Sequence, residues 1–355
     1  MTTVESPNSA EVINARKADH INFCLDHPSI DRQGSQYAAI RLMPNALPEL
    51  NFSDIDTSLY FLGKKISMPL MISSMTGGNS ALVKRVNKNL ALAAEACQIP
   101  MAVGSQRVMT VDSSARDSFD LRQYAPSTVL IANIGAVQLN CGLGKSDCNE
   151  VIDILKADGL YLHLNALQEV IQTEGDTDFS GLLSKIESLK NEIKVPLLIK
   201  EVGCGFSPNN VASLKKIGIT HIDLSGNGGT SWSKVEALRS QDKSDLGLIY
   251  QDWGLSTVEM LKQNAKFRSE LKFIASGGIR SGLDLAKSII LGARLGGVAL
   301  PFLKAATEST EAVVDVINKF HKELKTAMFL MGIQHINELF LNESLIINGE
   351  ETWSR

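Results

Sequence analysis

Two glycine-rich segments late in the chain have the composition of a phosphate-binding site. The first reads SGGIR over residues 276–280, and the second reads GGVALP over residues 296–301. Each follows a short apolar run. Glycine lets backbone N–H groups approach an anion closely, and Arg280 adds a fixed positive charge. The segments predict a phosphorylated ligand or cofactor, although two such turns without a ligand would have the same composition.

Lys200 lies inside the apolar run PLLIKEVG. A lysine in a buried strand is costly unless its charge faces an anion, a cofactor or a carboxylate. The alternation of a strand turns Lys200 and its neighbour Glu201 to opposite faces, which argues against an ion pair between them. We therefore expect Lys200 to face a bound anion or cofactor.

The segment HLNALQE, residues 163–169, combines groups that suit a diphosphate with a metal ion. His163 and Asn165 share one face of a predicted strand, and Gln168 and Glu169 are expected on the loop beyond it. An amide and a carboxylate so placed can orient a diphosphate and hold Mg²⁺, which takes few protein carboxylates and completes its shell with water and phosphate oxygens. The alternative for Glu169 is an acid that stabilises a helix N-terminus.

A basic cluster, RKADH at residues 16–20, supplies Arg16, Lys17 and His20. Such a cluster is typical of a solvated helix face, and a mobile basic segment could equally close over an anionic substrate. Arg107, in the segment GSQR, adds a further cation unless it is a solvated loop residue.

Further small and polar residues follow other predicted strands. The segments concerned are ISSMTGG at 72–78, GSQR at 104–107, Asn133 and LSGNGGTSW at 224–232. Thr76 and Gly77 could form a plain turn before a helix, and Asn133 could cap a strand end.

The elements that must position these residues recur in a βα pattern from residue 69 onward, which predicts a parallel sheet. Eight strands are predicted, at residues 69–75, 101–104, 129–134, 160–164, 195–202, 221–224, 272–275 and 297–300. Helical periodicity covers residues 81–96, 149–156, 181–188, 209–217 and 283–291. Residues 248–250 are assigned to a loop. Eight strands predict an α/β fold, a (β/α)₈ barrel whose active site lies at the C-terminal ends of the strands.

Residues 1–60 are predicted to form an N-terminal cap or lid segment, and residues 61–355 a single barrel domain. Pro28, Pro44 and Pro48 are expected to exclude long helices from the cap. The tail after about residue 308 is expected to form one or two helices.

Composition restricts the partners. The net charge of −4 gives no electrostatic reason to expect nucleic acid or an anionic membrane. The five cysteines show no CxxC spacing, which fits reduced thiols in a cytoplasmic protein. No apolar run approaches the roughly 18 residues of a membrane helix.

Taken together, the motifs RKADH, ISSMTGG, GSQR, ANIG, HLNALQE, IKEVGCG, LSGNGGTSW, ASGGIRSG and ALPFLKAA resemble those of the type 2 isopentenyl diphosphate isomerases, FMN-dependent enzymes of isoprenoid synthesis. They run in this order from residue 16 to residue 306. Several occur in other FMN barrels, but RKxxH with GSQR and HLNxxQE is specific in combination. Ser256 in DWGLST stands where relatives often have proline, and no expected contact depends on it.

The resemblance implies a site for each group. FMN is expected to contact Met75, Thr76, Gly77, Ser105, Asn133, Lys200, Ser225, Thr230, Gly278, Arg280, Ala299 and Leu300. The substrate is expected to contact Arg16, Lys17, His20, Ser105, Gln106, Arg107, His163, Asn165 and Gln168. Glu169 is implied as the Mg²⁺ ligand, and Gln168, Lys200 and His163 as the residues nearest the chemistry.

The implied reaction interconverts isopentenyl and dimethylallyl diphosphate, with reduced FMN supplying the acid–base function and no net redox change. The resemblance also implies NADPH as the reductant and a homotetramer or larger assembly. The alternatives are an FMN-dependent 2-hydroxy acid oxidoreductase on the same barrel, and a flavin- or phosphate-binding protein without catalysis. The oxidoreductase would need a His/Arg pair beside the flavin, and the late strand ends offer Arg280 without a histidine.

Overall fold

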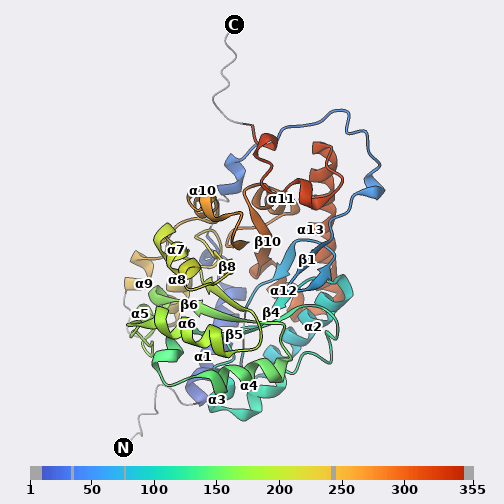
Figure 1. Cartoon of the computed structure of the whole chain (residues 1–355). Helices are drawn as coiled ribbons and strands as arrows, with labels where there is room; N and C mark the ends of the chain where they lie inside the picture. The colour runs from blue at the N-terminus through green and yellow to red at the C-terminus, as the bar shows by residue number, and fades with distance from the viewer. Residues whose placement is uncertain (1–9, 33–35, 76, 241–244, 348–355) are drawn as a thin grey trace, which may run out of the picture.

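Eight parallel strands close into a barrel in the order β10-β3-β4-β5-β6-β7-β8-β9, which confirms the predicted fold (Figure 1). The computed structural model describes residues 10–32, 36–75, 77–240 and 245–347. The barrel strands are β3 Leu70–Ile72, β4 Met101–Ala102, β5 Leu130–Gly135, β6 Gly159–Leu164, β7 Leu197–Glu201, β8 His221–Asp223, β9 Lys272–Ser276 and β10 Ala293–Val298.

Helices surround the strands and cover the mouth of the barrel (Figure 1). Those that follow strands or end the chain include α2 Ala81–Cys97, α4 Lys145–Leu155, α6 Leu182–Glu192, α7 Pro208–Lys216, α10 Thr257–Gln263, α11 Gly282–Ile290, α12 Leu300–Glu308 and α13 Thr310–Met331. The others are α1 Ala10–Asp26, α3 Val108–Val111, α5 Ala166–Ile171, α8 Trp232–Arg239 and α9 Leu246–Ile249. The five helices predicted from periodicity are all present, with ends shifted by a few residues.

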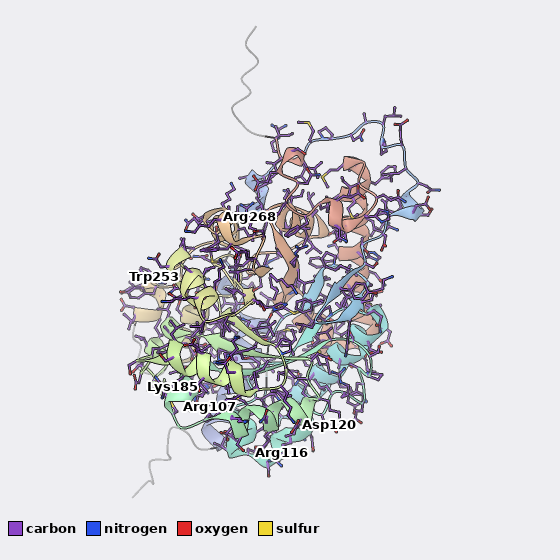
Figure 2. All side chains as sticks on the ribbon, in the orientation of Figure 1. Arg107, Arg116, Asp120, Lys185, Trp253 and Arg268 are labelled. Carbon is purple, nitrogen blue, oxygen red and sulfur yellow. The ribbon has the colours of Figure 1, made fainter. Side chains whose placement is uncertain are left out.

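Helix α2 illustrates why these segments are helical. The Ser80 hydroxyl accepts a hydrogen bond from the Val83 N–H, which caps the first turn. Val83, Val86 and Leu90 recur at helical spacing and are fully buried against the barrel. Polar side chains occupy the outer surface of the molecule, where Arg116 and Trp253 are 49% and 60% exposed (Figure 2).

The lower part of the barrel is filled by apolar side chains. Strand alternation points Met71, Ile131 and Leu198 into the barrel, where they form a buried cluster. An antiparallel hairpin, β1 Leu59–Phe61 with β2 Lys64–Ile66, adds Phe61 and Ile66 to this cluster. The hairpin was not predicted, and it closes the N-terminal end of the barrel. The predicted segment boundary at residue 60 lies within β1.

The glycine-rich sequence at the end of the barrel led to a wrong prediction for one strand. The last strand was placed at residues 297–300, but β10 runs over Ala293–Val298 and Leu300 begins α12. Glycine is a poor strand former, so the sequence GG obscured the strand. The space around Gly297 explains the glycine, because a Cβ there would lie 2.4 Å from the Ser73 hydroxyl. Residues 248–250 were predicted as a loop entering a helix, but residues 248 and 249 already belong to α9.

The N-terminal segment contains a long helix, contrary to the prediction from its prolines. Helix α1 has 17 residues and ends at Asp26, two residues before Pro28, the first of the three prolines used in the prediction. It contacts α3, α8 and α12 around the barrel mouth. The Asn14 amide donates to Asp112 at 2.8 Å, and its carbonyl oxygen accepts the Asn79 N–H at 3.1 Å. Helix α1 therefore lies over the C-terminal ends of the barrel strands, where its side chains line a cavity.

Candidate active site

A cavity of about 170 Å³ opens at the C-terminal ends of the barrel strands, where the sequence predicted the site. Residues from all eight strand ends or the loops that follow them contribute to its lining, and α1 contributes from above. Among the lining residues that the structure describes, none is an aspartate or a glutamate. The charged side chains of the described lining are therefore cationic, and they lie among neutral polar and apolar side chains.

One end of the cavity is built to bind an anion. Gly278 and Ile279 follow β9, and Ala299 and Leu300 follow β10, and all four residues line the cavity. Within the described chain, no acceptor is found for the backbone N–H groups of Gly278, Ile279 and Ala299. Leu300 is the first residue of α12, whose N-terminus adds a favourable dipole. This arrangement fits the phosphate predicted from the two glycine-rich segments.

Arg280 also lines this end, but its side chain is paired within the protein. Its guanidinium contacts the Asp31 carboxylate and donates to the Gly228 carbonyl at 3.4 Å. Asp31 itself is bridged to Thr230, so the chain following α1 is tied to the loop after β8. Arg280 is 33% exposed, which leaves part of its guanidinium open to a ligand.

The floor of the cavity carries Lys200, Asn133 and His163. The Lys200 ammonium donates to the Glu201 carbonyl oxygen at 2.6 Å, and the two side chains do not pair. The Glu201 carboxylate instead accepts the N–H groups of residues 202–205. Lys200 therefore lines the cavity and does not form an ion pair with Glu201, as the alternation of the strand predicted.

His163 is held beside this lysine as a neutral imidazole. Its Nδ1 lies 2.8 Å from the Asn133 side-chain oxygen. Burial, and then the nearby charges of Lys200 and Lys17, lower the pKa of His163 to about 3. The imidazole thus carries no charge at neutral pH.

Gln168 enters the cavity from α5 and is fixed at both ends of its amide. Its Nε2 donates to Glu236 Oε1 at 2.8 Å, and its Oε1 accepts from Asn165 at 3.2 Å. His20 Nε2 lies 2.9 Å from the same Glu236 oxygen. Gln168 and Glu169 were expected on a loop, but they lie within α5.

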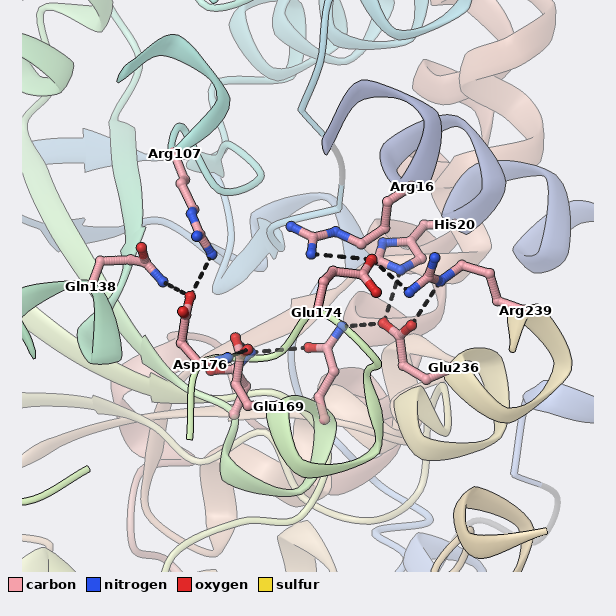
Figure 3. Close-up of polar contacts among 11 residues, drawn as sticks. Arg16, His20, Arg107, Gln138, Glu169, Glu174, Asp176, Glu236 and Arg239 are labelled. Atoms are coloured by element: carbon pink, nitrogen blue, oxygen red, sulfur yellow. Dashed lines mark hydrogen bonds and ion pairs between the residues drawn. The ribbon is translucent and has the colours of Figure 1, made fainter. Parts of the chain in front are cut away.

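Glu236, on α8, joins His20 of α1 to Gln168 (Figure 3). Burial alone would raise the pKa of Glu236, but His20, Gln168 and Arg239 together lower it to about 2. The carboxylate is therefore ionised and can hold both donors at neutral pH. The predictions missed Glu236, because a glutamate on a helical pattern resembles a surface residue.

The arginines expected to bind the substrate are paired with carboxylates (Figure 3). Arg16 lies 3.6 Å from Glu174, which also pairs with Arg239 at 2.8 Å. Arg107 lies 2.8 Å from Asp176. Glu174 and Asp176 follow α5 closely, and the predictions did not identify either residue. An anionic ligand would share these cations with the carboxylates.

Glu169 and Asn165 place side-chain oxygen atoms, of the kind that bind metal ions, next to this network. Glu169 accepts the Asn165 amide at 2.7 Å and the Asp176 N–H at 2.8 Å. The side-chain oxygen of Asn165 is buried and has no partner among the described residues. Burial raises the pKa of Glu169, so an approaching cation would favour its charged form. No group of three metal-binding side chains was found in the described ranges.

Most of the predicted site residues lie together around the cavity. The lining includes Lys17, His20, Met75, Ser105, Asn133, His163, Gln168, Lys200, Ser225, Thr230, Gly278, Arg280, Ala299 and Leu300. The structure places others outside the lining: Arg16, Gly77, Gln106, Arg107, Asn165 and Glu169. Thr76 lies outside the described residues.

Gln106 and Gly77 have structural contacts where the sequence suggested ligand contacts. Gln106 is fully buried, accepts the Asn133 N–H at 3.1 Å and donates to the Val151 carbonyl at 3.1 Å. A Cβ at Gly77 would lie 2.7 Å from Phe119, so this position requires glycine for close packing.

Comparison with known proteins gives a consistent result. The model of the family described as FMN-dependent dehydrogenase matches residues 14–128 and 154–347. An isopentenyl-diphosphate delta-isomerase of Hydrogenovibrio crunogenus is 50% identical over 337 residues, covering 94% of this chain and 98% of the relative. One of Paracoccus zeaxanthinifaciens is 52% identical over 339 residues, covering 94% of this chain and 97% of the relative.

Solved structures support the fold. An oxidised active mutant of (S)-mandelate dehydrogenase matches with a TM-score of 0.68 at 16% identity, covering 97% of this chain and 100% of that one. The flavin-binding domain of baker's yeast flavocytochrome b2 matches with a TM-score of 0.63 at 18% identity, covering 94% and 79%.

Proposed function

Because the chain belongs to the FMN-dependent dehydrogenase family and to the isopentenyl-diphosphate delta-isomerases, we propose that it interconverts isopentenyl and dimethylallyl diphosphate with reduced FMN and Mg²⁺. These relatives confirm the family resemblance inferred from the motifs, and the chain is an enzyme of this isomerase class. The cofactor state, the metal ion and the course of the reaction are the proposed part.

The observation that carries the proposal is the absence of carboxylates from the described lining of the cavity. Moving a double bond requires a proton donor and a proton acceptor. His163, whose pKa is about 3, is a weak base, and its protonated form is scarcely populated at neutral pH. Reduced FMN, when bound, would supply this acid–base function. The residues of the chain then bind, orient and shield the substrate.

The structure fits FMN at two places. The unpartnered N–H groups of Gly278, Ile279 and Ala299 suit its phosphate. The Ser73 hydroxyl is buried on the cavity floor and lacks a partner among the described residues. Lys200, from the same floor, would stabilise negative charge on the reduced ring.

We assign the substrate diphosphate to the cations that α1 and Arg107 bring over the cavity. Lys17 and His20 line the cavity from above, and Gln168 lies beneath them in the lining. Glu236 keeps the Gln168 amide in one orientation, so this side chain would align the reacting carbons rather than transfer a proton.

Mg²⁺ is assigned to Glu169. The free Asn165 oxygen beside it fits a hard cation, and the diphosphate would complete the shell. One carboxylate with substrate oxygens is a usual arrangement for this ion.

Replacing Arg280 with alanine is expected to weaken FMN binding by about 1.5–3 kcal/mol, the scale of a charge-assisted hydrogen bond. The loss should lie toward the lower end, because Asp31 shares the guanidinium. Titration of apoprotein with FMN, followed by absorbance, measures the effect. Unchanged affinity would remove Arg280 from the phosphate site.

The catalytic efficiency kcat/KM is expected to fall as pH rises through about 7. Burial, and then the positive charges of Arg16 and Arg107, lower the pKa of Lys17 to about 7. The ammonium form, which attracts the diphosphate, is present below this pH and lost above it. In Lys17→Arg the descending limb should move to higher pH, because arginine stays charged. An unmoved limb would assign the titration to another group.

The alternative oxidoreductase is not supported by the cavity. The described histidines in the lining are His20 and His163, and neither is paired with Arg280, whose partner is Asp31. The decisive assay supplies anaerobic, photoreduced enzyme with isopentenyl diphosphate, with and without Mg²⁺. We expect dimethylallyl diphosphate to form over many turnovers while the flavin stays reduced. Flavin oxidation in step with reduction of isopentenyl diphosphate, without dimethylallyl diphosphate, would contradict the isomerase and favour an oxidoreductase, because isomerisation consumes no electrons.

We further propose NADPH as the reductant, a cytoplasmic location, and a homotetramer or larger assembly. The five cysteines are free thiols, which fits a reducing compartment. No helix in the described part of the chain is both long and apolar enough to cross a membrane. Ile249 and Trp253 are 67% and 60% exposed, which suits a surface covered by another copy.

A further inference from the structure

The inward-facing residues at the upper end of the barrel form a ring, one from each strand or its extension. They are Ser73, Gly104, Asn133, His163, Lys200, Asp223, Ser276 and Gly297. The layer beneath is largely apolar and includes Met71, Ile131 and Leu198. Seven members of the ring line the cavity, and Asp223 is the member that does not. Asp223 therefore lies just beneath the cavity floor.

Asp223 is fully buried, and one of its two carboxylate oxygens accepts a side-chain hydrogen bond. The Ser276 hydroxyl donates to its Oδ1, while Oδ2 has no hydrogen-bond partner among the described residues. Burial raises the pKa of this carboxyl, and Lys200, Ser276, Tyr161 and the Ser225 N–H oppose that rise. The charge of Lys200 is the largest effect that opposes burial, and it favours the anionic form of Asp223.

Lys200 is the nearest cation of the ring. It is paired in register with Asp223 across β7 and β8, and both side chains point into the barrel. Lys200 is 6% exposed, and its ammonium donates to the Glu201 carbonyl rather than directly to Asp223. A buried charge without an opposite charge nearby is costly. The two residues thus supply one positive and one negative charge to the same layer.

We propose that Asp223 is the counter-charge of Lys200 and a positioning residue that limits how strongly the lysine favours the reduced, anionic cofactor. The inference rests on the proposed placement of FMN over Lys200. With Asp223 ionised, the buried Lys200 ammonium has an opposite charge in the same layer when no anion occupies the cavity. The same carboxylate weakens the positive potential at the cavity floor. The preference of the site for reduced over oxidised FMN is therefore smaller than Lys200 alone would produce.

The test is the relative affinity of Asp223→Asn for reduced and oxidised FMN. Asparagine keeps the shape and can still accept from Ser276, but it removes the charge. The ratio of affinities should shift toward reduced FMN by about tenfold, which is a rise of about 30 mV in the potential of the bound two-electron couple. A merely structural residue would weaken both forms alike. An unchanged or lowered ratio would overturn the proposal.

Two controls keep this result separate from other causes. Asp158→Asn also removes a partly buried carboxylate, one paired with Lys64 and Arg122, and should leave the ratio unchanged. If the unmodified protein does not bind FMN, the proposed function fails. If it binds FMN and Asp223→Asn leaves the ratio unchanged, only the counter-charge role fails.

Thermal unfolding of the apoprotein tests the pair without cofactor. Asp223→Asn should lower the Tm more than the double variant Asp223→Asn/Lys200→Met does, because the single change leaves a buried charge uncompensated. This comparison also decides the case in which Asp223→Asn does not fold. A folded double variant would support the pairing, and an unfolded double variant beside a folded Lys200→Met would overturn it.

Discussion

Replacing Gln168 with alanine is expected to lower kcat by about 10²-fold while FMN binding and the fold are retained. The Gln168 amide is held by Glu236 at 2.8 Å and by Asn165 at 3.2 Å, so it presents one fixed face to the cavity. Alanine removes that face and leaves room for the substrate to take unproductive poses. Steady-state kinetics on photoreduced enzyme, with product quantified directly, measures the change.

Val170→Ala is the matched control. Val170 lies on the same helix, α5, and is 60% exposed, so this change tests the helix without altering the cavity. Its kcat should match that of the unmodified enzyme. A Gln168→Ala enzyme with full kcat would show that substrate alignment does not depend on this side chain.

The double variant Arg16→Gln/Lys17→Gln is expected to raise KM by about 10²–10⁴-fold. Each charge-assisted hydrogen bond to a diphosphate contributes about 1.5–3 kcal/mol, and about 1.4 kcal/mol corresponds to a factor of ten. Stability should change little, because Glu174 keeps its bond to Arg239 when Arg16 is lost. The flavin spectrum should also remain, since the predicted FMN contacts lie on the barrel.

A variant with the same charge change elsewhere provides the comparison. Lys84→Gln/Arg116→Gln removes two cations whose side chains are 40% and 49% exposed. Figure 2 labels Arg116. Its KM should be unaffected at physiological ionic strength. Deletion through residue 20 should also abolish tight substrate binding, but it removes the His20 contact to Glu236 as well. Equal effects of the two double variants would indicate nonspecific attraction by net charge.

The sequence was sufficient to predict the barrel because its signal is local. Parallel strands covered on both faces must be apolar throughout, and each such run between helical patterns is visible without tertiary information. Gly278 and Arg280 were predictable for the same reason, since a glycine-rich turn after a strand places them at the barrel mouth. Lys200 was predictable because a cation buried in a strand is costly unless it faces an anion or a cofactor.

The positions of α1 and the hairpin were decided by tertiary contacts. Prolines suggested an irregular cap, yet α1 ends before Pro28 and is stabilised by packing on α3, α8 and α12. The hairpin β1–β2 is short and has a weak pattern. The apolar side chains Phe61 and Ile66 of the hairpin fill the N-terminal end of the barrel, and this packing explains why the hairpin forms there.

The partners of the site residues depended most on the tertiary structure. Gln106 and Arg107 are adjacent, but Gln106 is enclosed by the backbone while Arg107 reaches Asp176 across the mouth. Glu236 lies 68 positions from Gln168, and no local pattern relates the two. Residue types and spacing therefore were sufficient to predict the barrel and many residues of the cavity lining, because strand periodicity is a local property. The charge network around Gln168 was decided by the folded chain, because hydrogen bonds and ion pairs depend on distances in space.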